Sequence, residues 1–139
     1  MRKMILSALI LLPTFAFADV KSELGEIRKS YDACTSSPAN LEKCALDTYK
    51  KSDALLNKAY QEIVASLKMT SKSDPSSVEA LRRLKSSQRA WIAFRDTNCS
   101  LEGIEMLGGT GEHQIIASCL ANTTMDRVGQ LDRIFNSEH

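Results

Sequence analysis

The chain has 139 residues, of which 18 are Lys or Arg and 17 are Asp or Glu, so its formal net charge at pH 7 is +1. A chain of this length is expected to form one ordinary domain with a modest core. Charges balanced this evenly give no reason to expect nucleic acid or an anionic membrane as a partner.

The first 18 residues are predicted to be a secretory signal peptide. Arg2 and Lys3 carry positive charge, residues 4–12 are almost continuously apolar, and an Ala-x-Ala cleavage site ends at Ala18. An uncleaved membrane anchor is the less favoured alternative, because the apolar run is too short to cross a bilayer comfortably. We therefore expect residues 19–139 to be a single helical domain that is periplasmic or secreted and not embedded in the membrane.

Helical periodicity, with apolar residues at steps of three and four, covers most of the mature chain, and strand-like alternation is absent. The predicted helices span residues 19–33, 40–69, 75–106 and 111–136. Ser37 or Asn40 can cap the second helix, and Asp74 followed by Pro75 is a strong start for the third. A glycine-rich turn ends the third helix: Gly108-Gly109-Thr110-Gly111.

Each predicted helix carries one stripe of residues expected to face the core. The first stripe is Val20, Leu24, Ile27, Tyr31 and Cys34. The second is Leu41, Ala45, Tyr49, Ser52, Leu56, Tyr60, Ile63 and Leu67. The third is Val78, Leu81, Leu84, Gln88, Trp91, Arg95, Cys99 and Glu102, widened by Ile92. The fourth is Ile116, Leu120, Thr123, Arg127, Leu131 and Ile134.

The fold predicted from this pattern is all-α: an antiparallel bundle of three long helices plus a shorter N-terminal helix. Four cysteines, an even number in an exported chain, indicate two disulfides, and the absence of a C-x-x-C pair argues against a zinc site. Antiparallel helices place all four cysteines at one end of the bundle. The most local pairing is Cys34–Cys44 with Cys99–Cys119, although Cys44–Cys99 also stays geometrically open.

Several polar residues fall on or beside the predicted buried stripes. They are Asp53, Asn57, Gln88, Arg95, Asp96 and Arg127. A buried charge without a partner is costly, and partners are available on neighbouring helices. We therefore interpret these residues as a structural network that fixes helix register, in preference to a binding or catalytic cluster.

Three blocks of residues carry a resemblance to a known family. They are Cys34-x9-Cys44-Ala45 with Tyr49-x3-Asp53-x2-Leu56-Asn57-x2-Tyr60, then Gln88-Arg89-Ala90-Trp91-Ile92-x-Phe94-Arg95-Asp96-x2-Cys99, then Cys119-Leu120 with Thr123-x3-Arg127-x3-Leu131. In these blocks the chain resembles the LprI-type domain family of small exported bacterial proteins. The resemblance implies a helical, cysteine-bridged extracytoplasmic domain, favours pairing the first cysteine with the second and the third with the fourth, and suggests lysozyme inhibition.

The residues give little support for an enzyme. His113 and His139 are the two histidines, and no recognisable catalytic or phosphate-binding motif is present. Glu102, Glu105 and Glu112 lie near His113, but their spacing matches no common metal-ligand set. We expect no enzymatic activity, no cofactor and no metal, and we interpret the glycine-rich segment as a turn that joins helices in preference to an anion site.

A protein partner is the function that the sequence favours. The segment between Cys99 and Cys119 is acidic and rich in glycine, and its candidate partner-binding residues are Glu102, Glu105, Gly108, Gly109 and Glu112. Because a disulfide would hold this segment rigid, we expect that it could insert into the carboxylate-bearing cleft of a basic, lysozyme-like muramidase. The alternative hypothesis is an immunity-like or accessory periplasmic protein that binds another envelope partner and does not inhibit lysozyme.

Overall fold

The computed structural model describes residues 15–136 and consists of four α-helices and two short 3-10 turns. The helices are α1 (Phe15–Thr35), α2 (Leu41–Thr70), α3 (Pro75–Glu102) and α4 (Gly111–Asn136), and the 3-10 turns are η1 (Pro38–Asn40) and η2 (Gly103–Met106). The predicted signal peptide lies mostly outside the described residues. No strand occurs between residues 15 and 136.

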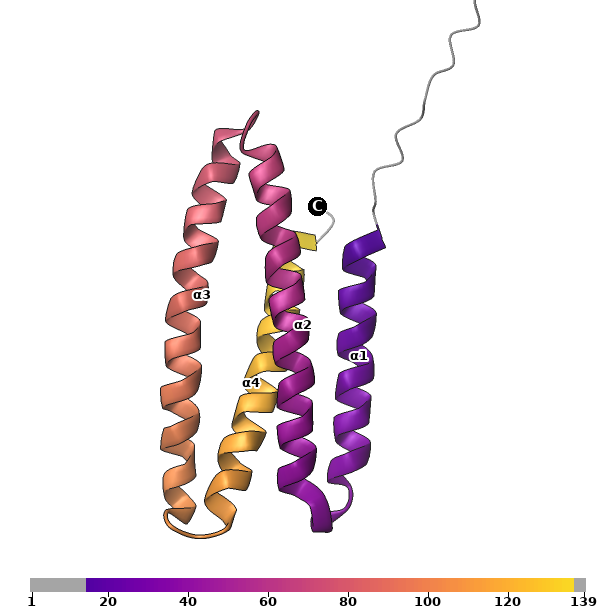
Figure 1. Ribbon diagram of the computed structural model, residues 1–139, viewed down its shortest axis with the longest axis vertical. Coiled ribbons are helices and arrows are strands. Elements are labelled where there is room, and N and C mark those ends of the chain that lie inside the picture. Colours follow the sequence, from indigo (N-terminus) through magenta and orange to yellow (C-terminus); the bar gives the residue numbers. More distant parts are fainter. Residues whose placement is uncertain (1–14, 137–139) are drawn as a thin grey trace, which may run out of the picture.

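The helices form an antiparallel bundle in which α2 and α4 lie between α1 and α3 (Figure 1). The α1–α2 and α3–α4 connections lie at one end, and the α2–α3 turn lies at the other. With 21 residues, α1 is shorter than the other three helices, which have 30, 28 and 26. The predicted all-α bundle is therefore confirmed. In the part of the chain that the structure describes, no helix has the length and apolar character needed to cross a membrane.

Two disulfides join the helices at the end that holds the α1–α2 and α3–α4 connections. Cys34 is bonded to Cys44, and Cys99 is bonded to Cys119. The local pairing is confirmed, and the alternative Cys44–Cys99 bridge is excluded. We call this end of the molecule the bridged end.

Capping and turn residues predict some of the helix ends correctly and others wrongly. Asp74 caps α3 as predicted, because its Oδ1 accepts a hydrogen bond from the backbone N–H of Ser76 at 2.9 Å. The predicted cap of α2 is wrong: neither Ser37 nor Asn40 makes a side-chain capping bond, since the η1 turn leads directly into the helix. The third helix was expected to reach Met106, but its last residues tighten into η2.

The centre of the core lies between α2 and α4, which share the most extensive contact in the molecule. Small side chains on both helices are almost completely buried there: Ala45, Ser52 and Ala59 on α2, and Ala117, Ala121 and Thr124 on α4. Small residues let two helix backbones approach closely, so larger side chains fill the space on either side. From α1, the predicted stripe residues Val20, Leu24, Ile27 and Tyr31 complete this core.

Part of the predicted core is wrong. Val78, Ile92 and Ile134 are exposed, by 55%, 40% and 57%. The most deeply buried face of α4 instead carries Ala117, Ala121, Thr124 and Val128, so much of the predicted stripe is displaced by one position. The large apolar residues of α4 lie about one position away from its most buried face, because the close α2–α4 contact requires small side chains there. Leu131 and Arg127 are buried as predicted.

Candidate functional site

The segment that joins α3 to α4 is a loop with a defined backbone. The N–H of Gly109 donates to the carbonyl oxygen of Met106 at 2.8 Å, and the N–H of Gly108 donates to Oε2 of Glu112 at the same distance. Gly108 has a φ of +73°, in the left-handed region where a side chain is strained. The backbone conformation of the turn therefore requires a glycine at position 108.

This loop also packs closely against α4. A Cβ atom added to Gly103 would lie 2.8 Å from Cγ1 of Ile116, so a glycine at the start of η2 permits the close approach. The Cys99–Cys119 disulfide ties the end of α3, about one turn before η2, to α4. A covalent bond, a side-chain hydrogen bond and close packing thus hold the loop.

The acidic residues predicted to bind a partner have different surroundings. Glu102 is exposed and accepts a hydrogen bond from Nδ2 of Asn98 at 2.9 Å. Glu105 is exposed within η2. Glu112 is half-buried, and its carboxylate accepts a hydrogen bond from the N–H of Gly108, so it is directed toward the loop and not toward solvent. Glu102 and Glu105 can therefore reach a partner, whereas Glu112 holds the loop in place.

Apolar residues at the bridged end form a feature that the sequence reasoning missed. Leu101 and Ile104 are 64% and 58% exposed, and with Ile115 they surround a hollow of about 340 Å³ whose other lining residues are Glu102 and Glu105. We call these five residues the loop patch. The signal was present in the sequence, because Leu101 and Ile104 are apolar but lie off the predicted stripe of the third helix.

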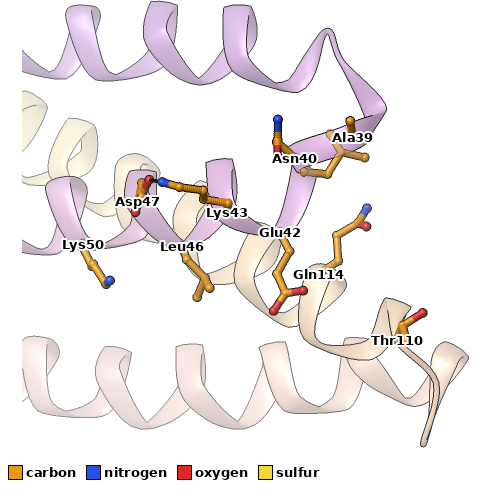
Figure 2. A pocket seen from close by; sticks show the side chains of 10 residues that line it. Ala39, Asn40, Glu42, Lys43, Leu46, Asp47, Lys50, Thr110 and Gln114 are labelled. Carbon is orange, nitrogen blue, oxygen red and sulfur yellow. Dashed lines mark hydrogen bonds and ion pairs between the residues drawn. The ribbon is translucent and has the colours of Figure 1, made fainter.

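A second depression at the bridged end has a mixed polar lining (Figure 2). It has a volume of about 610 Å³ and lies between the first turns of α2 and the start of α4. Lys43 and Asp47 form an ion pair of 2.5 Å along its α2 side, and the lysine lowers the pKa of the Asp47 carboxyl below its usual value. Figure 2 shows Glu42, Leu46 and Lys50 on one face of α2. Because charges of both signs line it, this depression is less selective for a charged partner than the loop patch.

Arg95 is the centre of a polar cluster between α3, α2 and α4. Its guanidinium donates to Oδ1 of Asp96 at 2.9 Å, to Oδ1 of Asp53 at 3.2 Å and to Oγ1 of Thr124 at 3.4 Å. Asn57 extends the cluster by donating to Asp53 at 3.3 Å. Burial disfavours the charge of Arg95, but the hydrogen bond to Asp96 and further interactions outweigh it, so the pKa of Arg95 is raised.

The same arginine is held between two aromatic rings. Its guanidinium carbon lies 5.3 Å from the ring centre of Tyr49 and 5.1 Å from that of Trp91. Burial raises the pKa of the Tyr49 phenol, while the charge of Arg95 opposes that shift. Arg95 therefore links α3 to α2 by charge and by aromatic contact.

Arg127 forms a second cluster, which also contacts Trp91. It lies 5.5 Å from the ring centre of Trp91 and donates to Oε1 of Gln88 at 3.1 Å, to Oγ of Ser87 at 2.8 Å and to Oε1 of Gln130. All three acceptors are neutral, and burial lowers the pKa of the Arg127 guanidinium. The six residues interpreted as one network are thus divided between two arginine centres that meet at a single tryptophan.

Neither cluster has the composition of a metal or catalytic site. Between residues 15 and 136, no three His, Cys, Asp or Glu side chains gather in a way that could hold a metal ion. His113 is exposed at the start of α4.

Comparisons with known proteins agree with the resemblance in the sequence. A family model described as lysozyme inhibitor LprI matches residues 32–131. An uncharacterized protein of Rhizobium meliloti (strain 1021) is 39% identical over 105 residues, which cover 73% of this chain and 76% of that protein. The uncharacterized protein YecT of Escherichia coli (strain K12) is 35% identical over 105 residues, covering 70% of this chain and 64% of YecT. No solved structure matches the chain significantly.

Proposed function

Because this chain belongs to the LprI family, we propose that it is an extracytoplasmic protein-binding domain that inhibits lysozyme-like muramidases. The description of the family model supports the choice of target. Two disulfides support the location, since thiols in the cytoplasm of most organisms are kept reduced. The proposed role is that of an inhibitor and not of an enzyme.

The observation that carries the proposal is the loop patch on a fixed loop. Exposed apolar groups gathered around a hollow are typical of a surface that binds another protein. Here they are held by the Cys99–Cys119 bridge and by the contact between Glu112 and Gly108. A loop that is already ordered loses little conformational freedom on binding, which favours affinity.

The acidic groups of the loop patch suit a basic enzyme. Glu102 and Glu105 line the hollow beside Leu101 and Ile104. Complementary charge speeds the encounter between partners and orients them, while the apolar centre supplies most of the affinity. We propose that Ile104 and Leu101 enter the cleft of the muramidase and that the two glutamates face its basic rim.

The test is inhibition of lysozymes of several classes, measured as lysis of a peptidoglycan suspension with the purified mature protein. We expect the wild-type protein to slow lysis. Ile104→Glu should raise the concentration needed for half-inhibition at least tenfold, because it places a charge at the apolar centre. Glu105→Lys should weaken inhibition and should do so most at low salt.

The matched control is Met69→Glu. Met69 is 70% exposed and lies near the end of α2 that is opposite the bridged end. The same change of an exposed apolar residue to glutamate should therefore leave inhibition unchanged. Absence of inhibition at large excess over every lysozyme class would refute the proposal and favour the alternative, an immunity-like or accessory protein. Capture of a different envelope protein that also depends on Ile104 would then identify the partner.

A further inference from the structure

A groove between α3 and α4 lies away from the loop patch, between the first half of α3 and the last turns of α4. Its volume is about 330 Å³, within the range of small-molecule sites, which is roughly 300–1,000 Å³. The apolar residues that line it are Ala80, Leu84, Leu131, Ile134 and Phe135. The polar residues that line it are Arg83, Ser87 and Arg127.

Two of the three polar residues that line this groove lie together at one end. Ser87 and Arg127 are joined by a hydrogen bond of 2.8 Å, so they lie at the same level of the bundle. Because α3 and α4 are antiparallel, the residues before Ser87 lie beside the residues that follow Arg127. The groove therefore runs from Arg127 toward Ala80 and Phe135, and Arg83 is the one charged residue among the apolar residues that line that course.

Within residues 15–136, the positive charge of Arg127 has no ion pair with a carboxylate, and the groups that accept its hydrogen bonds are neutral. Its residue exposure is 5%, and its acceptors within the described part of the chain are the neutral groups of Ser87, Gln88 and Gln130. Arg95, by contrast, contacts two carboxylates. Arg83 also lines the groove, but its guanidinium is paired with Glu79 at 2.8 Å. A buried cation among neutral groups is stabilised by an anion that reaches it.

We propose that this groove binds an amphipathic monocarboxylate, such as a medium-chain fatty acid, with the carboxylate at Arg127 and the alkyl chain along α3 and α4. Arg127 donates from Nε, Nη1 and Nη2 to Gln88, Gln130 and Ser87, so the second N–H groups of Nη1 and Nη2 are the donors left for the carboxylate. The alkyl chain would lie against Leu84, Leu131 and Phe135. The site is independent of the muramidase surface, because the two lie on different halves of the bundle.

The experiment titrates the mature protein with dodecanoate below its micellar concentration. Binding is measured by calorimetry and by the fluorescence of Trp91, the chain's only tryptophan, whose ring lies 5.5 Å from the Arg127 guanidinium. We expect one site per chain. Shorter carboxylates should bind more weakly, by up to about fourfold for each methylene removed. Dodecanol, which has the same tail without the charge, should bind at least tenfold more weakly than dodecanoate.

Two serine variants test the position of the carboxylate. Ser87→Glu places an anion of the protein's own beside Arg127 and should weaken dodecanoate binding at least tenfold while the bundle stays folded. Ser86→Glu makes the same change at an exposed neighbour that does not line the groove, and it should bind like the wild type. Circular dichroism and thermal unfolding of both variants check that the helices are intact.

Several results would overturn the proposal. They are absence of dodecanoate binding, equal binding of dodecanol, or wild-type affinity in Ser87→Glu. If inorganic phosphate competes with dodecanoate and binds with the same affinity, the site recognises anions and the apolar groove does not contribute to binding. Binding that appears only in a chain ending at Asn136 would show that the protein's own terminus occupies the groove.

Discussion

At the scale of single residues, the two buried arginines hold α3 against the rest of the bundle. Their positions were predictable, because both fall on a stripe with helical spacing. Their partners Asp53, Asp96 and Gln88 also belong to the predicted network. Thr124, Tyr49 and Ser87 do not, since they are ordinary polar residues until the helices are placed side by side. The same holds for Trp91, which the sequence marks as a core residue but not as the ring shared by two guanidinium groups.

Replacing Arg95 with Ala should lower the free energy of unfolding by about 2–4 kcal/mol, because charge-assisted hydrogen bonds and two aromatic contacts are lost together. Urea denaturation followed by circular dichroism measures the change. Arg82→Ala is the matched control, since Arg82 is exposed on the same helix and pairs only with Glu79. Its urea midpoint should be indistinguishable from that of the wild type. An equally unchanged midpoint for Arg95→Ala would show that this cluster does not stabilise the fold.

At the scale of helices, the sequence predicted the number, order and approximate ends of the elements. It did so because Pro75, the glycines after η2 and the apolar spacing are local signals. The sequence did not predict which face of a helix is buried where that burial depends on contact with another helix. The face of α4 that carries Ala117 and Ala121 is buried because α2 lies close to it, and no property of α4 alone reveals that contact.

The cap of α3 predicts a dependence of stability on pH. Hydrogen bonds from the Ser76 side chain and from the Ser76 backbone lower the pKa of the Asp74 carboxyl below its usual value. The charged cap therefore stabilises the folded state above the unfolded pKa of about 4, and this contribution is lost as the pH falls through the lower folded pKa. Asp74→Asn keeps a capping oxygen but does not titrate.

We expect Asp74→Asn to be less stable than the wild type at pH 6, and we expect this difference to shrink as the pH falls through the folded pKa of Asp74. Thermal unfolding at a series of pH values measures the difference. A constant difference between the two proteins across that range would mean that the charge of Asp74 does not contribute to the cap.

The composition of α3 also predicts where the bundle opens first. Among the residues of α3, Leu84 is the one large aliphatic side chain that is buried, whereas α2 buries Leu55, Leu56, Ile63 and Val64. A helix with few buried apolar contacts can open locally at a free-energy cost lower than that of global unfolding. In native-state hydrogen exchange, amides of residues 78–90 should be less protected than those of residues 50–64. Equal protection would indicate a single cooperative unit.

At the scale of the whole molecule, the two bridges are expected to stabilise the fold alike but to differ in the proposed binding function. Both hold the same end, but only Cys99–Cys119 encloses the loop patch. Replacing either pair with alanines should lower the free energy of unfolding by about 3 kcal/mol, since each bridge closes a loop of modest length. At a temperature where both variants are folded, only the variant without Cys99 and Cys119 should lose muramidase inhibition. Equal loss in both variants would mean that the loop needs no local tether.

The sequence placed all four cysteines at one end, because helix lengths and short connections determine where each helix begins and ends. It could not show which side of that end a partner meets. The position of the loop patch depends on how closely η2 packs against Ile116 of α4. This contact joins two segments whose relative positions are not known from the sequence alone.

The turn between α2 and α3 makes this protein convenient to attach to a surface. Lys72 and Ser73 are exposed there, at the end opposite both disulfides. Exposed turns tolerate added chemistry better than helices do. A dye or a biotin joined at Ser73→Cys would orient every molecule with its bridged end outward, so that a sensor chip would present the loop patch uniformly to each enzyme passed over it.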